Sequence, residues 1–304
     1  MSMLPHGAAA AGGGVTLHRF LGEPRVRPHP VAVFGWAMKR LEGPLYHDDR
    51  MQGAVYLGTG LVAAAVAGGV VRSTTAGTYL AVAGRSLADE ARAIASHLSA
   101  GDLASARAAL PVLVGRDTAD LSAGEVARAV VESVAENAVD ALVAPALWGA
   151  AGGATGALCH RAVTTLDSLG GPGAGRYEHC GWAAARADDV AAWVPAHVTA
   201  GLVALVRPAA ASTVLRTVMR DAPGHPSPSA GVAEAAFAGA LGLRLGGPSS
   251  YGGRFEERPR LGDGRPPAAA DIESACRLLE DVGLALVGLL YMPLVVHTGR
   301  RMLR

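Results

Sequence analysis

The sequence predicts an all-α protein: a polytopic integral membrane helical bundle with an extramembrane helical hairpin. Charged residues make up only 17% of the 304 residues, whereas soluble domains average about 25%. Hydrophobic residues reach 50% and the mean hydropathy is +0.28. Several long stretches also lack Lys, Arg and Glu. The main alternative is a soluble, Ala-rich α/β enzyme, which the composition disfavours but leaves open.

Apolar stretches of about membrane-spanning length carry the prediction of a bundle. A straight span needs about 20 mostly apolar residues, so the first stretch is marginal and the last two are short. Their many alanine and glycine residues permit close helix packing. Proline inside three of them predicts kinks or broken helices. The stretches are 54–71, 138–159 with Pro145, 190–206 with Pro195, and 282–296 with Pro293.

Polar helices between the first two stretches predict the extramembrane hairpin, over residues 85–137. Ser86 and Asp102 are each expected to cap a helix, and a capping-box pattern at 122–125 begins a third helix. This organisation predicts a single domain over 1–304 into which the hairpin is inserted.

An acidic stripe leads into the second apolar stretch: Glu132, Glu136 and Asp140. On a helix this spacing places three carboxylates on one face, where each like-charged pair costs about 0.2–0.5 kcal/mol. Mg²⁺, which binds one or two carboxylates plus substrate phosphates, would relieve that repulsion. Alternatively, Arg128 neutralises Glu132 and the stripe is a solvated helix face; the pattern alone does not choose between the two. Asn137 lies beside the stripe.

Two charged clusters flank this region. Arg116 and Asp117 lie just before the stripe helix; a guanidinium suits phosphate or carboxylate, although a structural Arg–Asp turn is the commoner role of such a pair. Arg186, Asp188 and Asp189 precede the third apolar stretch. Adjacent aspartates point about 100° apart on a helix, so they share a metal only at a helix end. Charges that mark a membrane boundary are the alternative.

Turn-rich segments supply the remaining candidates. The Gly- and Pro-rich stretches 221–231 and 246–267 are expected to be loops, whose backbone N–H groups can cradle an anion. Ordinary loop punctuation is the alternative for each. The sequence contains neither a Walker A loop nor a Rossmann GxGxxG motif. The candidate binding residues in these turns and in the segment TTLDSLGG are His225, Ser227, Tyr251, Asp167 and Ser168.

Charge and cysteine usage disfavour two further classes. The net charge is +1 without a long basic run, which argues against nucleic acid as a partner. The three cysteines are scattered without CxxC spacing, which argues against a disulfide framework and a structural metal site.

Taken in order, the motifs resemble those of the CobD/CbiB family of cobalamin biosynthesis, the adenosylcobinamide-phosphate synthases. The resemblance covers nearly the whole chain from residue 21 on. It rests on PHPVAVFGW (28–36), GRSLADEA (84–91), VGRDTADL (114–121), VESVAENAVDALVAP (131–145), TTLDSLGG (164–171), GWAAARADDVAAWVPA (181–196), APGHPSPSAG (222–231) and GGPSSYGG (246–253).

The resemblance implies a membrane-bound, ATP-dependent acid–amine ligase. Such an enzyme attaches aminopropanol, or its phosphate, to a corrin side-chain carboxylate of adenosylcobyric acid. ATP as co-substrate, Mg²⁺, the corrinoid and the lipid bilayer are the implied partners, together with either a second copy of the chain or other cobalamin-assembly enzymes. The implied location is the inner or plasma membrane, multi-pass, with a cytoplasmic active site because the substrates are cytoplasmic.

The resemblance also implies roles for the candidate residues. Activation of a carboxylate, most simply to an acyl phosphate, needs carboxylates for Mg²⁺ and arginines for phosphate. Catalytic roles are expected for Glu136, Asn137, Asp140, Arg116 and Asp117. Substrate or phosphate binding is expected for Arg186, Asp167, Ser168, His225, Ser227 and Tyr251. Metal binding is expected for Glu132, Glu136, Asp140, Asp188 and Asp189.

Three alternatives remain at this point. A degenerate paralogue would fit the N-terminal stretch LHRFLGEP (17–24), which departs from the family pattern. An AmpE-like membrane sensor is expected to lack the GHPSP and GGPSSYGG loops that this chain has, and a transporter usually shows inverted repeats. Sidedness is also open: 138–160 either crosses the membrane or dips in and returns, and only the second form lets 85–137 and 161–189 meet.

Overall fold

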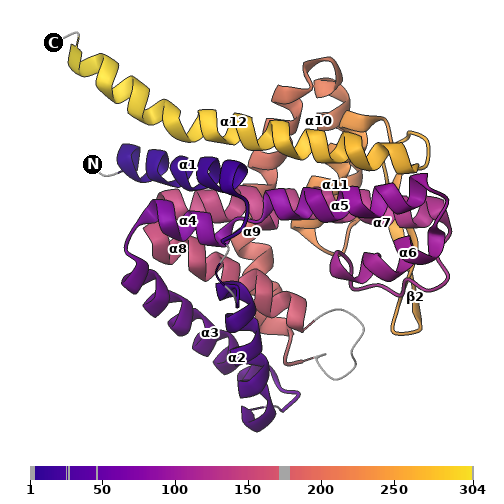
Figure 1. Cartoon of the computed structure of the whole chain (residues 1–304), viewed down its shortest axis with the longest axis horizontal. Helices are drawn as coiled ribbons and strands as arrows, with labels where there is room; N and C mark the ends of the chain where they lie inside the picture. The colour runs from indigo at the N-terminus through magenta and orange to yellow at the C-terminus, as the bar shows by residue number, and fades with distance from the viewer. Residues whose placement is uncertain (1–3, 25, 27, 46, 171–178, 303–304) are drawn as a thin grey trace. The chain divides into compact units, whose positions relative to one another are not determined.

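The computed structural model describes residues 4–24, 26, 28–45, 47–170 and 179–302. These residues form helices and one two-stranded antiparallel sheet (Figure 1), which confirms the predicted helical class. The chain forms two compact units, each assembled from separate segments. Unit 1 consists of Met1–Ala83, Asp140–Ala192 and Leu284–Arg304, and unit 2 of Gly84–Val139 and Trp193–Gly283. The hairpin expected over 85–137 therefore corresponds to one segment of unit 2.

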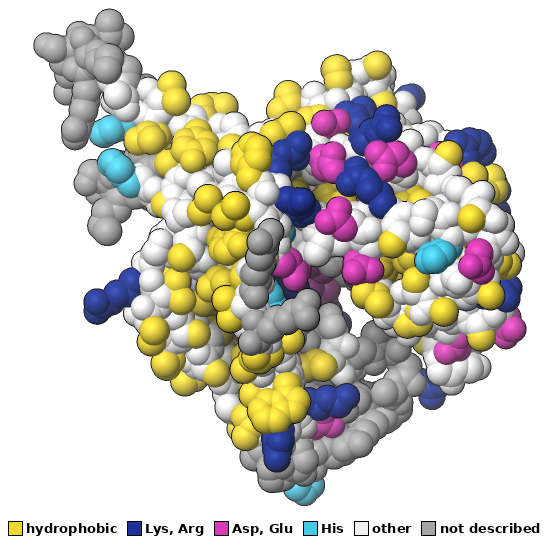
Figure 2. Space-filling model, viewed as in Figure 1, with side chains coloured by type: hydrophobic (Ala, Val, Ile, Leu, Met, Phe, Trp, Pro, Cys, Tyr) yellow, Lys and Arg dark blue, Asp and Glu magenta, His cyan; other side chains and the backbone are white. Residues whose placement is uncertain are grey.

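Helices of membrane-spanning length and composition are present, as predicted. Large apolar side chains on them are exposed: Val62 is 65% exposed and Val190 is 78% exposed. Figure 2 shows hydrophobic side chains on the surface of unit 1. Exposed apolar surface of this extent on long helices is typical of lipid contact rather than of a soluble enzyme. The candidate spans are Arg50–Val71, Ala123–Leu169, Trp182–Val206 and Ala269–Thr298.

Unit 1 packs its helices through small residues. On α3, the valines at 55, 62, 66 and 70 are exposed, whereas the residues at 53, 60, 64 and 68, glycine or alanine, are buried. A Cβ on Gly68 would lie 2.5 Å from the Cα of Thr155, so only glycine permits this approach of α3 to α8. The elements of unit 1 are α1 (Leu4–Leu21), α2 (Pro30–Leu45), α3 (Arg50–Val71), α4 (Thr74–Ala81), α8 (Ala144–Leu169), the start of α9 (Trp182–Val206) and the end of α12 (Ala269–Met302).

Helix α8 folds back on itself at Gly153. This glycine has φ 65° and ψ −154°, a conformation that is essentially restricted to glycine. A Cβ on Gly156 would collide with the carbonyl oxygen of Trp148, although residues eight apart in a straight helix lie about 12 Å apart. The apolar stretch 138–159 is therefore not one straight helix, because it reverses at Gly153.

Replacing Gly153 by alanine is expected to lower the free energy of unfolding by about 1–3 kcal/mol, because alanine is strained at this positive φ. Gly152→Ala is the matched control: Gly152 has an ordinary φ, and a Cβ there would meet no atom within 4 Å. The measurement is equilibrium unfolding of both variants in detergent. Equal loss in the two variants would contradict a sharp reversal at Gly153.

Unit 2 contains the polar helices and the sheet. The sheet corrects the loop prediction for 246–267: strands β1 (Leu245–Tyr251) and β2 (Arg254–Leu261) pair in antiparallel register, with Tyr251 opposite Arg254 at the turn. The helices of unit 2 are α5 (Gly84–Ser99), α6 (Leu103–Ala109), η1 (Leu110–Val112), α7 (Ala123–Ala138), the end of α9, η4 (Pro208–Ala210), α10 (Ala211–Asp221), η5 (Ala222–Gly224), α11 (Pro228–Leu241) and the start of α12.

Helix starts in unit 2 follow the sequence signals in two of three cases. The side chain of Asp102 accepts a hydrogen bond from the backbone N–H of Ser105 at 3.0 Å. Ser122 and Glu125 form the complete capping box at the start of α7. The cap predicted at Ser86 is wrong, since α5 already begins at Gly84. Helix α7 is thus anchored at its start, which fixes the rotation of the acidic stripe that it carries.

Candidate active site

Helix α7 holds strand β1 through two oppositely charged side chains. The guanidinium of Arg128 donates hydrogen bonds to the carbonyl oxygens of Gly246 and Pro248. The carboxylate of Glu132 accepts a hydrogen bond from the backbone N–H of Gly246 at 2.8 Å. Gly246 has φ +75°, and a Cβ there would collide with the carbonyl oxygen of Pro259. The GGPSSYGG motif is therefore explained in part by the close approach of β1 to α7 and β2.

Arg116 is the principal cationic partner of Glu132. Its Nη2 lies 2.7 Å from Oε2 of Glu132, and both side chains are more than nine-tenths buried. Arg128, the partner considered from helical spacing, lies 4.0 Å from the other carboxylate oxygen. Glu132 is thus neutralised mainly by a residue that precedes α7, and each of its carboxylate oxygens is engaged. Two further nitrogens of Arg116, Nε and Nη1, are buried without a hydrogen-bond partner among the described residues.

Asp117 fastens the turn between β1 and β2. Its carboxylate accepts hydrogen bonds from the hydroxyl of Ser250 at 2.6 Å and from the backbone N–H groups of Gly252 and Gly253 at 3.1 and 2.9 Å. The hydrogen bond from Ser250 and those from the two glycine N–H groups hold the pKa of Asp117 below its usual value. Asp117 therefore holds the turn next to Arg116. This is a structural role, whereas the sequence predicted a catalytic one.

Helix α11 adds a third carboxylate, Glu234, which is 3% exposed. Burial, together with the charges of Glu132 and Glu136, raises the pKa of Glu234 well above its usual value. Nε2 of His225 lies 3.9 Å from its Oε1. Burial also lowers the pKa of His225, whose Nδ1 lies 2.9 Å from the carbonyl oxygen of Ser227. The GHPSP segment thus belongs to the same charged region as the stripe helix.

Glu136 is the accessible carboxylate of this region. Its side chain is exposed, whereas Glu132 and Glu234 are buried. Arg116 and Arg258 both interact electrostatically with Glu136. Arg258 also lies over the ring of Tyr251, with its guanidinium carbon 5.0 Å from the ring centroid, and its buried Nε has no hydrogen-bond partner among the described residues. A solvent-accessible carboxylate beside arginines with unused donors is the arrangement that can receive an anionic substrate and a proton.

We call the set Arg116, Glu132, Glu136, Glu234 and Arg258 the Arg–Glu cluster. Its five members all belong to unit 2. Asn137 follows Glu136, but its Nδ2 donates to the carbonyl oxygen of Ser133 at 3.0 Å and to the hydroxyl of Ser133 at 3.4 Å, which leaves its side-chain oxygen for a substrate. His225, Ser227 and Tyr251 border the cluster; Ser227 caps α11.

The remaining candidates belong to unit 1. Asp140 follows the end of α7 in a π-helical turn, η2 (Val139–Val143), so the α-helical spacing from Glu136 is not maintained. Arg161 on α8 interacts electrostatically with Asp140. Arg186 pairs with Asp189 at 3.2 Å on an exposed surface, and Asp188 is 8% exposed. The hydroxyl of Ser168, next to Asp167, donates to the carbonyl oxygen of Thr164.

The described residues offer hydrogen-bond donors for a phosphate more clearly than a complete set of metal ligands. They contain no group of three or more His, Cys, Asp or Glu side chains placed to hold a metal ion. Mg²⁺ needs fewer protein ligands when it binds with a phosphate, since one or two carboxylates and substrate oxygens suffice. The unpartnered donors of Arg116 and Arg258 suit phosphate oxygens, and Glu136 supplies an accessible carboxylate. The residues therefore fit a Mg²⁺–phosphate group, with the metal held partly by the substrate.

Two members of the cluster, Glu234 and Arg258, were not among the candidates from sequence. Glu234 could have been found from the sequence, because it is the sole charged residue of the apolar helix α11. A lone carboxylate on an apolar helix indicates a buried partner or a function. Arg258 could not have been found in this way, because it is one of several charged residues in RFEERPRL. Only the pairing of β1 with β2 places it beside Tyr251.

Comparison with known proteins identifies relatives over most of the chain. Residues 11–279 match the family model described as CobD/Cbib protein. The "Cobalamin biosynthesis protein CobD" of Mycobacterium tuberculosis is 46% identical over 275 residues, covering 86% of this chain and 88% of that protein. The proteins of the same name from Pelobacter propionicus and Klebsiella pneumoniae are 40% identical (80% and 81% covered) and 39% identical (85% and 88% covered). No solved structure matches the chain significantly.

Proposed function

Since the chain belongs to the CobD/CbiB family, we propose that it is a membrane-bound enzyme of cobalamin biosynthesis that forms an amide bond at the expense of ATP. The acid would be a corrin side-chain carboxylate of adenosylcobyric acid, and the amine would be aminopropanol or its phosphate. The observation that carries the proposal is the Arg–Glu cluster, in which buried guanidinium nitrogens of Arg116 and Arg258 without hydrogen-bond partners among the described residues lie near the accessible carboxylate of Glu136.

The cluster supplies the interactions that such a reaction requires. A carboxylate reacts with an amine only after activation, and phosphate transfer depends mainly on positioning and on neutralising negative charge. Arg116 and Arg258 would bind the phosphate or the corrin carboxylate. Mg²⁺ held by Glu136 and the phosphate would add charge neutralisation.

Glu136 has a second role in the proposal. An ammonium group must lose protons before and during attack, and an accessible carboxylate beside the bound acid can accept one. Glu132 would instead hold Arg116 and strand β1 in place, since its two carboxylate oxygens bind Arg116 and the N–H of Gly246. The metal-binding roles of Asp140, Asp188 and Asp189 and the phosphate-binding role of Arg186 stay predictions from the family resemblance.

The test is amide formation by the purified protein. The full chain in detergent is incubated with adenosylcobyric acid, ATP, Mg²⁺ and either aminopropanol or aminopropanol phosphate, and the corrinoid product is identified by mass spectrometry. Glu136→Ala and Asp140→Ala are each expected to lower the rate at least about 100-fold, as loss of a general base or metal ligand does. Glu90→Ala, an exposed carboxylate on α5, is the matched control. Normal rates in both variants would contradict the assigned site, and absence of any ATP-dependent product would contradict the function.

A further inference from the structure

A cavity apart from the Arg–Glu cluster lies on the β1 side of α7. Its volume is about 290 Å³, and it is lined by the start of α7, the start of β1, the end of β2 and the segment that precedes α12. The lining of the cavity includes Pro248, Pro266 and Pro267, which provide apolar walls. Cavities for small organic ligands begin at about this volume, so the space suits a small ligand and excludes a corrin ring.

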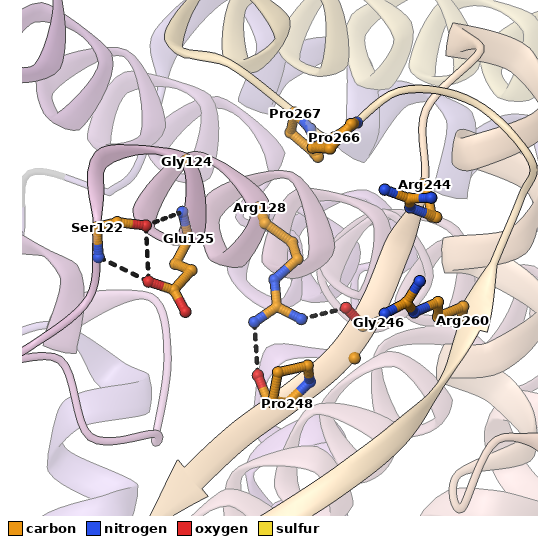
Figure 3. A pocket seen from close by; sticks show the side chains of 11 residues that line it. Ser122, Gly124, Glu125, Arg128, Arg244, Gly246, Pro248, Arg260, Pro266 and Pro267 are labelled. Atoms are coloured by element: carbon orange, nitrogen blue, oxygen red, sulfur yellow. Dashed lines mark hydrogen bonds between the residues drawn. The ribbon is translucent and has the colours of Figure 1, made fainter.

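The cavity is positively charged. Arg128, Arg244 and Arg260 line it against one carboxylate, that of Glu125. Arg128 is occupied by the carbonyl oxygens of Gly246 and Pro248, and Glu125 by its capping box with Ser122. Figure 3 shows the side chains of Arg244 and Arg260 on the same side of the cavity, beyond Gly246.

Arg244 and Arg260 are the unused cations of this cavity. No acidic partner for the side chain of either one is found among the residues that the structure describes, and Arg244 is half-buried while Arg260 is exposed. Two guanidinium groups that line one cavity, neither of them paired with a carboxylate, suit a phosphate. The start of α7 lines the same cavity, so the positive end of the helix dipole adds to its charge.

We propose that Arg244 and Arg260 form the binding site for the phosphate of a small phosphorylated co-substrate, separate from the Arg–Glu cluster. The inference rests on the proposed function, because that reaction provides two such compounds, aminopropanol phosphate and ATP. Arg128 links the two sites: it lines the cavity and lies 4.0 Å from Glu132.

Binding is measured by calorimetry on the full chain in detergent, without turnover. The probes are aminopropanol phosphate, unphosphorylated aminopropanol, ATP and inorganic phosphate. Arg244→Ala and Arg260→Ala are each expected to weaken binding of the phosphorylated probe at least about tenfold, the effect of losing one charged hydrogen bond. Arg244→Lys and Arg260→Lys keep the charge and should retain part of the affinity. Arg254→Ala, an exposed arginine on β2 outside the cavity, should bind like the wild type.

The two sources of phosphate give different outcomes. If the alanine variants lose affinity for aminopropanol phosphate but bind ATP normally, the site binds the amine donor. If they lose affinity for ATP but bind aminopropanol phosphate normally, the site binds the nucleotide. Unchanged affinity for both compounds in both alanine variants, with wild-type thermal unfolding, would overturn the inference. So would a wild-type protein that binds neither compound. Because no amide has to form, loss of phosphate binding in an inactive protein would support this site while contradicting the proposed function.

Discussion

Replacing Arg116 by alanine is expected to lower the free energy of unfolding by about 3–5 kcal/mol, the usual result of removing one partner of a buried ion pair. Arg116 lies 2.7 Å from Glu132, and both side chains are buried. Without it, Glu132 keeps only Arg128 at 4.0 Å and one N–H group, while Glu136 and Glu234 stay nearby. The buried carboxylate of Glu132 therefore loses its nearest cationic partner. Equilibrium unfolding in detergent measures the change.

Two controls separate charge pairing from the general effect of losing an arginine. Arg186→Ala removes an exposed arginine that pairs with Asp189, and its stability should be close to that of the wild type because exposed pairs contribute little. Arg116→Ala combined with Glu132→Gln should recover part of the loss, since the carboxylate that Arg116 neutralised is then also removed. If the double variant is as unstable as the sum of the two single variants, the pair is not coupled and the explanation is wrong.

Replacing Gly246 by alanine is expected to lower the free energy of unfolding by about 3 kcal/mol or more, because backbone strain and a steric collision act at the same position. The φ of +75° is strained for alanine, and the new Cβ would collide with the backbone of Pro259 on β2. Moving Gly246 also removes the N–H that Glu132 accepts and shifts the carbonyl that Arg128 binds. The activity should fall together with stability, since the strand positions the Arg–Glu cluster.

Gly253→Ala is the matched control for this prediction. Gly253 has a similar φ of +78°, but a Cβ there would meet no atom within 4 Å. The expected loss is about 1 kcal/mol, the ordinary penalty of alanine at a left-handed position. The difference between the two variants in denaturant unfolding isolates the collision. A loss at Gly253 as large as that at Gly246 would show that β1 and β2 do not approach each other as described.

The charged partners in the Arg–Glu cluster could be inferred only in part from the sequence. The four-residue spacing identified the stripe helix, and the spacing also offered Arg128 as the partner of Glu132. The structure instead pairs Glu132 most closely with Arg116, from the segment before α7. It also adds Glu234 from more than ninety residues further along the chain. Spacing on one helix states which side chains share a face, whereas the charges that neutralise them depend on contacts between distant segments.

The sequence by itself determined the helical class, the long apolar segments, the caps of α6 and α7 and the motif order that relates the chain to its family. These features depend on local composition and on hydrogen bonds within a few residues. Only the tertiary structure decided that the stretch 246–267 contains two paired strands, that α8 reverses at Gly153, and that Glu136 and Glu234 both interact electrostatically with Arg116 and Arg258. Backbone reversals and charge neutralisation of this kind arise from close approach between elements, which local patterns do not encode.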